Sequence, residues 1–146
     1  MEDRRPPIFR VFNEIGIISQ LSNAALARRL PDGLHPSQFA LLSNLTRLGD
    51  GKTPADLARA FQVPKASMTN TLMQLEKRGF ITVNTHPDDM RKKQVFVTEA
   101  GRAVFLEVVS KSAGPLMELT SDIEGLEEIL PVLEALRKKL DENRNL

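Results

Sequence analysis

Apolar side chains recur every three or four residues near the start of the chain. This spacing predicts one amphipathic helix over residues 8–30. Two prolines stand before it, and the turn sequence Pro31-Asp32-Gly33 ends it. Because so long a helix extends beyond the core of a small domain, we expect it to pack against a second subunit. The apolar stripe consists of Ile8, Val11, Phe12, Ile15, Ile18, Leu21 and Ala25.

Three shorter helices follow, each between recognisable start and stop signals. Pro36 opens the first, and a Gly-Asp-Gly turn closes it. Thr53 is a suitable N-cap and Pro54 a suitable first residue for a second helix that ends near residue 61. A third runs from residue 64 or 65 to Gly79. The second and third helices are joined by the tight connection Gln62-Val63-Pro64. Two short helices joined by a turn of this length predict a helix-turn-helix. The expected inward positions are Phe39, Leu42, Leu45, Leu48, Leu57, Ala58, Phe61, Met68, Leu72 and Leu75.

Two segments with strand composition come directly after the helix-turn-helix. They are residues 80–85 and 94–98, and the basic loop HPDDMRKK at residues 86–93 separates them. A hairpin in this place is the wing of a winged helix. The fold class is therefore mainly α with one small β-hairpin.

The last third of the chain is again helical. Thr98 is expected to cap a helix over residues 99–120, with Ala100, Val104, Val108 and Ser112 on one line. Gly114-Pro115 should kink or divide it, and Pro131 should bend or restart the final helix. The apolar surface of the two ends exceeds what a monomer buries easily, which favours a homodimer. Packing within one chain is the alternative.

Composition excludes several classes of protein. The 146 residues are 41% hydrophobic and 27% charged, as expected of a globular domain. We find neither an apolar leader nor a transmembrane stretch, so we expect a cytoplasmic protein without membrane contact. Without cysteine there is no disulfide or thiol chemistry. The chain has no catalytic triad, phosphate loop or metal-spaced histidines, so we expect no enzyme, cofactor or metal. His35 and His86 are read as solvated turn residues.

Charge is unevenly distributed although the net charge is only +1. Residues 47–102 hold ten Lys or Arg against six Asp or Glu, whereas the remainder is acidic. A basic centre suits contact with a polyanion, and chance scatter is the alternative.

The polar face of the second helix of the helix-turn-helix carries candidate DNA-reading residues. Small and hydrogen-bonding side chains at the start of a helix suit the major groove. An ordinary solvent-exposed face is the alternative. The candidates are Lys65, Ala66, Ser67, Thr69, Asn70, Gln74 and Lys77.

The predicted wing carries a second group of DNA-binding candidates. Arg91 at the hairpin tip has the chemistry to enter a minor groove, with Asp89 bracing it through a charge-assisted hydrogen bond. Lys92 and Lys93 would contact phosphates. A solvated charged loop is the alternative.

Four segments in order resemble the MarR family of winged-helix transcription regulators. HPSQFALLSNL is similar to the second helix of that family, and TPADLARAFQVPKASMTNTLMQLEKRGFI to its helix-turn-helix. PDDMRKK resembles the wing, with the Asp-x-Arg pair on Asp89 and Arg91, and TEAGRAV resembles the opening of the next helix. Pro64 replaces a frequent Ser or Thr cap, which removes one phosphate contact. The redox-sensing cysteine of one branch is also absent.

The resemblance implies a homodimer that binds double-stranded DNA at a pseudo-palindromic operator. It implies one domain over residues 1–146, with dimerisation helices at 8–31 and 103–146 and a winged helix-turn-helix at 35–102. A repressor released by a small, often aromatic, ligand is typical of many members. Candidate pocket residues are Phe12, Ile15, Phe39 and Phe105, which serve equally well as core. A winged-helix module that binds protein rather than specific DNA is the alternative function.

Overall fold

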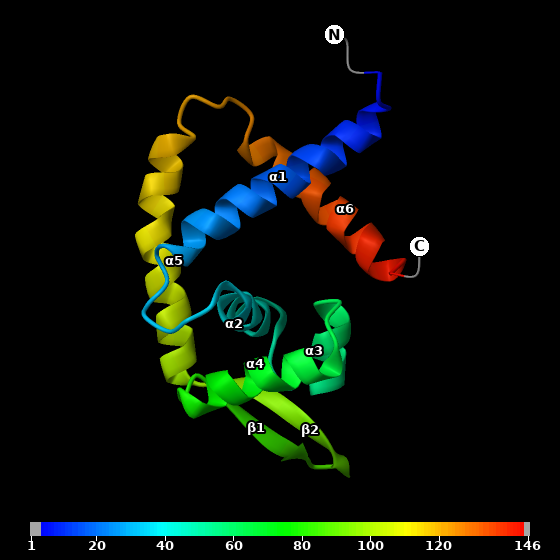
Figure 1. The fold of residues 1–146 in the computed structure, drawn as a ribbon, viewed down its shortest axis with the longest axis vertical. Helices are drawn as coiled ribbons and strands as arrows, with labels where there is room; N and C mark the ends of the chain where they lie inside the picture. The colour runs from blue at the N-terminus through cyan, green and yellow to red at the C-terminus, as the bar shows by residue number, and fades with distance from the viewer. Residues whose placement is uncertain (1–3, 145–146) are drawn as a thin grey trace.

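The computed structural model describes residues 4–144. Residues 1–3 and 145–146 of the predicted domain lie outside this range. Six α-helices, one 3-10 helix and a two-stranded antiparallel hairpin make up the described chain, so the predicted fold class is confirmed (Figure 1). The elements are α1 Pro7–Ala27, α2 Pro36–Leu48, α3 Pro54–Ala60, α4 Lys65–Lys77, β1 Ile81–His86, β2 Asp89–Val97, α5 Glu99–Leu119, η1 Glu127–Ile129 and α6 Leu130–Glu142.

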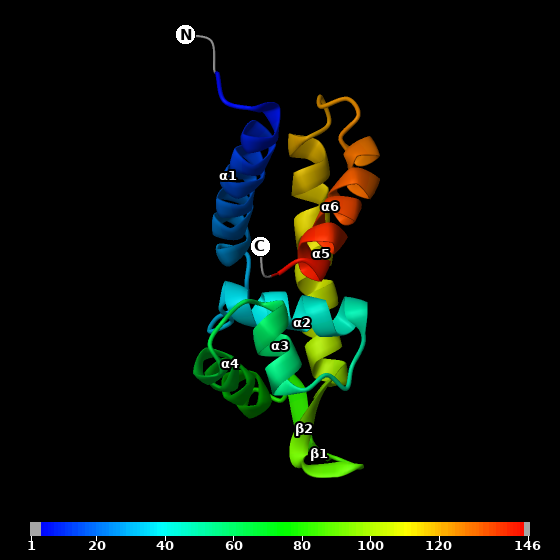
Figure 2. The ribbon, with the colours of Figure 1, turned by 90° about the vertical axis from the view of Figure 1, so that its right-hand side faces the viewer.

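The elements form two regions joined by α5. One region contains α2, α3, α4 and the hairpin, while α1 and α6 lie at the other end of the molecule (Figures 1 and 2). The long helix α5 starts beside the hairpin and extends to the end where α6 begins. This arrangement separates the predicted DNA-binding face from the terminal helices.

The core surrounds α2, which packs against α4, α5, β2 and α1. Because α2 has neighbours on several sides, its buried surface is wider than the single stripe expected from the sequence. Leu41 is 1% exposed although it was not predicted to face inward. Leu48 was predicted to be buried and is 51% exposed, because α2 ends there and Gly49 turns the chain with a positive φ of 99°. The largest fully buried side chains are Leu41, Leu42, Leu45, Leu57, Leu75, Ile81, Val95 and Val108.

The helix-turn-helix forms as the sequence predicted. The Thr53 hydroxyl accepts a hydrogen bond from the Asp56 backbone N–H at 3.1 Å and so caps α3. Gln62 adopts a left-handed φ of 53° in the turn, where the Val63 N–H donates to the Ala58 carbonyl at 3.0 Å. Helix α4 then starts at Lys65 and buries its three predicted apolar residues, Met68, Leu72 and Leu75.

Strand β2 is longer than predicted, β1 lies one residue later than predicted, and the turn is confined to Pro87 and Asp88. Thr85 pairs with Lys93, but the next residue, His86, pairs with Asp89. Residues 90–92 therefore bulge out of the ladder. The prediction that the basic residues lie in a loop is corrected accordingly: they lie within the bounds of β2. The backbone pairing resumes at Lys93 and holds both ends of the bulge.

Helix α5 begins at a tight junction with the hairpin. The Thr98 hydroxyl caps the helix by accepting from the Gly101 N–H at 3.1 Å and donates to the Gly79 carbonyl at 2.6 Å. A Cβ on Gly101 would lie 2.1 Å from the Phe80 carbonyl oxygen, so only glycine allows this approach. The helix then runs through Pro115 without dividing, contrary to one of the two predicted outcomes. Pro115 removes one backbone N–H donor from α5, yet the chain remains helical on both sides of it.

The terminal helices leave their apolar surfaces uncovered. Helix α1 ends at Ala27, three residues before the predicted end, and contains no buried residue. Helix α6 restarts with Pro131 in its first turn, as predicted, and also contains no buried residue. Phe9 is 65% exposed and Leu21 67% exposed. Within residues 4–144, no helix has the length and apolarity needed to cross a membrane.

Candidate nucleic-acid interface

The polar face of α4 is open to solvent. Met68, Leu72 and Leu75 pack the apolar face of α4 against the core, so the polar face on the other side of the helix points away from the core. All seven predicted DNA-reading residues are exposed: Lys65, Ala66, Ser67, Thr69, Asn70, Gln74 and Lys77. The Thr69 hydroxyl donates to the Lys65 carbonyl at 2.9 Å, which leaves its oxygen lone pairs able to accept from a ligand. Pro64 precedes the helix and makes no side-chain cap, as expected from the sequence.

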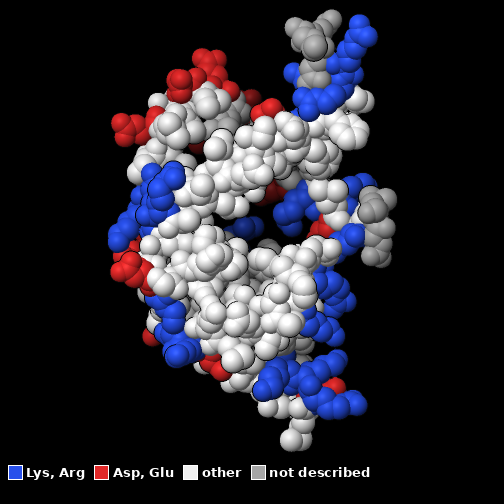
Figure 3. Space-filling model, viewed as in Figure 1, with Lys and Arg blue, Asp and Glu red and all other residues white. Residues whose placement is uncertain are grey.

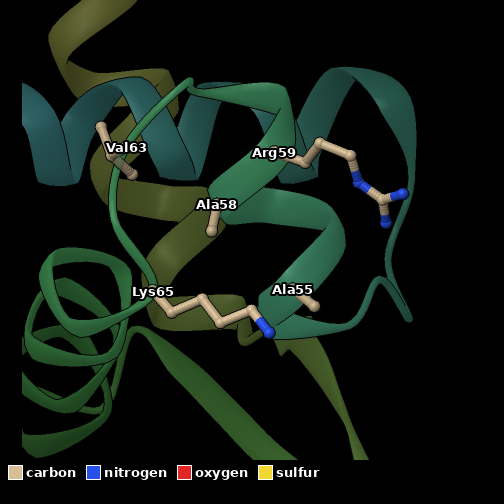
Figure 4. Close-up of a pocket in the computed structure, with 5 residues that line it drawn as sticks. All are labelled: Ala55, Ala58, Arg59, Val63 and Lys65. Carbon is tan, nitrogen blue, oxygen red and sulfur yellow. The ribbon is translucent and has the colours of Figure 1, made fainter.

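A hollow of about 440 Å³ lies beside the turn between α3 and α4 (Figure 4). Ala55, Ala58 and Val63 give it an apolar lining. The Lys65 side chain extends along the hollow towards Ala55, whereas the guanidinium of Arg59 points away from it. That guanidinium contacts the Asp56 carboxylate at 2.6 Å.

Gln74 is held by a residue that the sequence analysis did not select. The buried Gln38 of α2 donates a hydrogen bond from its Nε2 to the Gln74 Oε1. Gln38 also accepts from the His35 backbone N–H at 3.0 Å, and the His35 ring accepts from the Ser37 N–H at 3.3 Å. A Gln three residues after a helix N-cap is a capping-box signal, which identifies this role. His35 is therefore more than a solvated turn residue, because it caps α2.

Glu76 attaches α4 to the hairpin. It is an exposed acid on α4, and its carboxylate accepts a hydrogen bond from the Val83 backbone N–H of β1 at 2.8 Å. Since Val83 lies in the middle of β1, this bond helps to fix the angle between helix and hairpin. Sequence alone showed an acid in a polar face but gave no indication of its partner.

Asp89 and Arg91 form the contact that their spacing predicted. The Arg91 N–H donates to Asp89 Oδ1 at 3.0 Å, and its guanidinium donates to Oδ1 at 3.2 Å and to Oδ2 at 3.4 Å. The side-chain hydrogen bond from Arg91 is the main reason that the pKa of the Asp89 carboxyl lies below its usual value. The Arg91 side chain remains 90% exposed. The pair therefore presents an oriented guanidinium at the end of the hairpin.

Basic side chains gather over the hairpin end of the molecule. Lys92 and Lys93 are exposed beside Arg91, and Figure 3 shows Lys and Arg atoms over this end. Acidic side chains gather instead over the connection between α5 and α6 (Figure 3). The charge asymmetry expected from the sequence is thus an asymmetry in space, which favours approach of a polyanion to the hairpin end.

Asp50 connects the hairpin to α5, another role that the sequence did not indicate. Its Oδ1 accepts from the Val97 backbone N–H at 2.8 Å, and its Oδ2 accepts from Arg102 at 2.6 Å. The carboxylate therefore holds the end of β2 and the first turn of α5 to the loop after α2.

The four candidate pocket residues are only partly brought together. Phe39 of α2 and Phe105 of α5 stack with ring centroids 5.7 Å apart and an interplanar angle of 24°. Phe12 and Ile15 lie on α1, where Phe12 is 40% exposed and Ile15 is half-buried. The hydroxyls of Thr46 on α2 and Ser112 on α5 are buried and have no hydrogen-bond partner within residues 4–144.

Residues 34–93 match the model of the MarR family. This span covers α2, the helix-turn-helix and most of the hairpin. The resemblance read from the sequence is thereby confirmed.

Solved structures of transcription regulators have the same fold. Transcriptional regulator BldR from Sulfolobus solfataricus is 24% identical with a TM-score of 0.78, over 92% of this chain and 99% of that chain. Transcriptional regulator Tm0710 from Thermotoga maritima is 26% identical with a TM-score of 0.63, over 97% and 99%. A mutant MarR from E. coli complexed with operator DNA is 25% identical with a TM-score of 0.69, over 95% and 99%.

Proposed function

We infer that this chain, whose residues 34–93 form a MarR-family domain, is a DNA-binding transcriptional regulator of that family. More specifically, we propose that it binds a pseudo-palindromic operator as a homodimer. The observation that carries this proposal is the combination of an exposed polar face on α4 with a braced Arg91 on the adjacent hairpin.

The two surfaces would contact different parts of the duplex. Helix α4 offers short hydrogen-bonding side chains to base edges in the major groove, led by Ser67, Thr69 and Asn70. Arg91 would enter the neighbouring minor groove, where the potential is most negative, while Lys92 and Lys93 neutralise phosphates. Asp89 limits the freedom of the Arg91 side chain before binding, which lowers the entropy lost on contact.

The uncovered faces of the terminal helices support the homodimer. Residues 8–31 and 103–146 are proposed as the dimerisation segments, and residues 35–102 as the winged helix-turn-helix. Phe9 and Leu21 of α1 together with Leu130 and Leu133 of α6 expose apolar area that a partner subunit would cover. A two-fold dimer would present two copies of α4 to half-sites about 10 bp apart, or a multiple of that distance.

We further propose that the protein is a repressor released by a small aromatic ligand. The Phe39–Phe105 stack supports this, since it lies between α2 of the winged helix and the long α5. The unpartnered hydroxyls of Thr46 and Ser112 on the same two helices would gain a partner from a polar group on such a ligand. Thermal-shift measurements with a panel of aromatic acids test this, and a uniform lack of stabilisation would count against it.

Selection of bound sequences from a random duplex library tests the main proposal. The expected result is a near-palindromic consensus whose affinity falls steeply with salt, because each neutralised phosphate releases counterions. Recovery of random sequence at physiological salt would refute specific DNA binding. Salt-independent affinity would favour a protein-binding module instead.

A further inference from the structure

Gln38 of α2 is a polar residue in the buried core, with only 4% of its surface exposed. It lies in the first turn of α2, and both polar atoms of its carboxamide form hydrogen bonds. The oxygen accepts from the His35 backbone N–H at 3.0 Å, and the nitrogen donates to Gln74 on α4. Gln38 therefore connects the start of α2 directly to the recognition helix.

The direction of these hydrogen bonds is fixed by chemistry. A backbone N–H can only donate, so the atom of Gln38 that faces His35 must be its oxygen. The Gln38 amide nitrogen then faces Gln74, and an NH₂ group also only donates. Gln74 consequently has to present its own oxygen to Gln38. One backbone N–H thus determines how both carboxamides are turned.

The side-chain NH₂ group of Gln74 has no hydrogen-bond partner within residues 4–144. No other hydrogen bond of its side chain occurs within residues 4–144, and the residue is exposed on α4. A glutamine that is free to rotate can present either its donor or its acceptor to a base. Gln74 is restricted to one orientation, because turning it over would set two NH₂ groups against each other.

We propose that Gln38 is a positioning residue that holds Gln74 as a hydrogen-bond donor to the operator. This inference rests on the proposed DNA-binding function. Gln74 would then recognise an acceptor in the major groove, such as O6 or N7 of guanine or O4 of thymine. It would discriminate against cytosine, which presents a donor amino group at the same place. Base preference at one position of each half-site is therefore set by a residue that does not touch DNA.

Gln38→Glu provides the sharpest test. The carboxylate still accepts from the His35 N–H but offers Gln74 an acceptor instead of a donor. Gln74 would turn over to donate its NH₂ to the carboxylate and would present its oxygen to the DNA. The preference at its base position should change from guanine or thymine towards cytosine or adenine, with the other positions of the site unchanged.

Sequences bound by the full-length wild type, Gln38→Glu and Gln74→Ala are selected from the same random duplex library. Gln74→Ala identifies the position that Gln74 reads, because the preference there is lost. Circular dichroism and thermal melting confirm that each variant folds. If Gln38→Glu does not fold, Gln38→Met keeps the side-chain length and removes both polar atoms. Its preference for guanine over cytosine at that position should fall roughly five- to tenfold.

Three results would overturn the proposal. In the first, a folded Gln38 variant keeps the wild-type base preference while Gln74→Ala changes it. In the second, Gln74→Ala alters no position of the consensus. In the third, substitution of Gln38 weakens binding to all sequences equally, as a purely structural role would require. A wild-type protein that selects no consensus is a separate result, and it refutes the DNA-binding function itself.

Discussion

Asp89 and Arg91 are joined by three hydrogen bonds at the start of the hairpin bulge. The Asp89 carboxylate accepts from the Arg91 backbone N–H at 3.0 Å and from its guanidinium at 3.2 and 3.4 Å. The backbone bond shapes the bulge, and the guanidinium bonds orient the charge. A single acid therefore couples the local backbone to the direction of Arg91, the one arginine of the hairpin over residues 81–97.

Removal of Arg91 should weaken operator binding. Arg91→Ala takes away the proposed minor-groove contact, and we expect a loss of about 1–3 kcal/mol in binding free energy. Fluorescence anisotropy with labelled operator at fixed salt measures it. Lys111→Ala is the matched control, since Lys111 is an exposed cation on α5 paired with Glu107, away from the hairpin. Equal effects of the two substitutions would contradict a specific role for Arg91.

Asp89→Asn should also weaken operator binding, but by less than Arg91→Ala. The amide retains one acceptor oxygen for the Arg91 N–H and loses the charge that orients the guanidinium. Tighter binding by this variant would show that repulsion between Asp89 and phosphate outweighs the bracing. Because Arg91 lowers the pKa of the Asp89 carboxyl, the group is ionised throughout pH 5–8. The difference between wild type and Asp89→Asn should accordingly be constant over that range.

Thr53→Ala should destabilise the helix-turn-helix and change its response to acid. Loss of the cap is expected to lower the free energy of unfolding by about 1 kcal/mol. Thr53 is also the main reason that the pKa of the Asp56 carboxyl is lowered. Because the pKa of Asp56 is lower in the folded protein than its ordinary value of 3.8, ionised Asp56 adds to the free energy of unfolding above pH 3.8. This contribution is lost as the pH falls through the pKa of Asp56 in the folded protein.

Urea denaturation at pH 7 and at pH 3 checks this prediction. The gap in stability between wild type and Thr53→Ala should narrow at the lower pH. A gap that widens on acidification would contradict the proposed coupling of Thr53 and Asp56.

Two glycines of α5 should respond differently to substitution by alanine. In Gly101→Ala the new Cβ meets the Phe80 carbonyl oxygen at 2.1 Å and a Val97 methyl at 2.9 Å, so the helix must move. We expect a loss of at least about 1–3 kcal/mol. In Gly114→Ala no atom beyond the chain neighbours lies within 4 Å of the new Cβ, but the following Pro115 disfavours a helical backbone for a residue that carries a Cβ. This cost offsets the gain in helix propensity, so we expect a change of less than about 1 kcal/mol. Thermal melting of both variants compares them, and similar melting temperatures would contradict the close packing at Gly101.

A charge on α1 should disrupt the proposed dimer. Leu21 is 67% exposed in the single chain, so Leu21→Glu should not disturb its core. In a dimer it would bury an unpaired carboxylate, and we expect the dissociation constant to rise at least about tenfold. Sedimentation velocity over a range of concentrations measures it. Leu48→Glu is the control, because Leu48 is an exposed leucine on α2 outside the terminal helices. Unchanged sedimentation of Leu21→Glu would argue against α1 as an interface.

Much of the fold could be predicted because its signals are local. Thr53 and Thr98 cap the helices that the sequence assigned to them, and Met68, Leu72 and Leu75 face inward at helical spacing. The errors occurred where neighbours outside the element decide burial or continuity. Leu41 was missed because α2 is surrounded by several elements, and α5, which packs against α2, continues through Pro115.

The sequence by itself determined the order of helices and strands, the Thr53 and Thr98 caps and the Asp89–Arg91 pair, because all of these depend on residues within a few positions of each other. Only the tertiary structure decided which distant groups meet. Gln38 and Gln74 are 36 positions apart, and Asp50 and Arg102 are 52 apart. Such pairings depend on the angles at which helices pack and on the register of the hairpin, and no local spacing rule specifies either. The orientation of Gln74 on the recognition helix is therefore a property of the folded core.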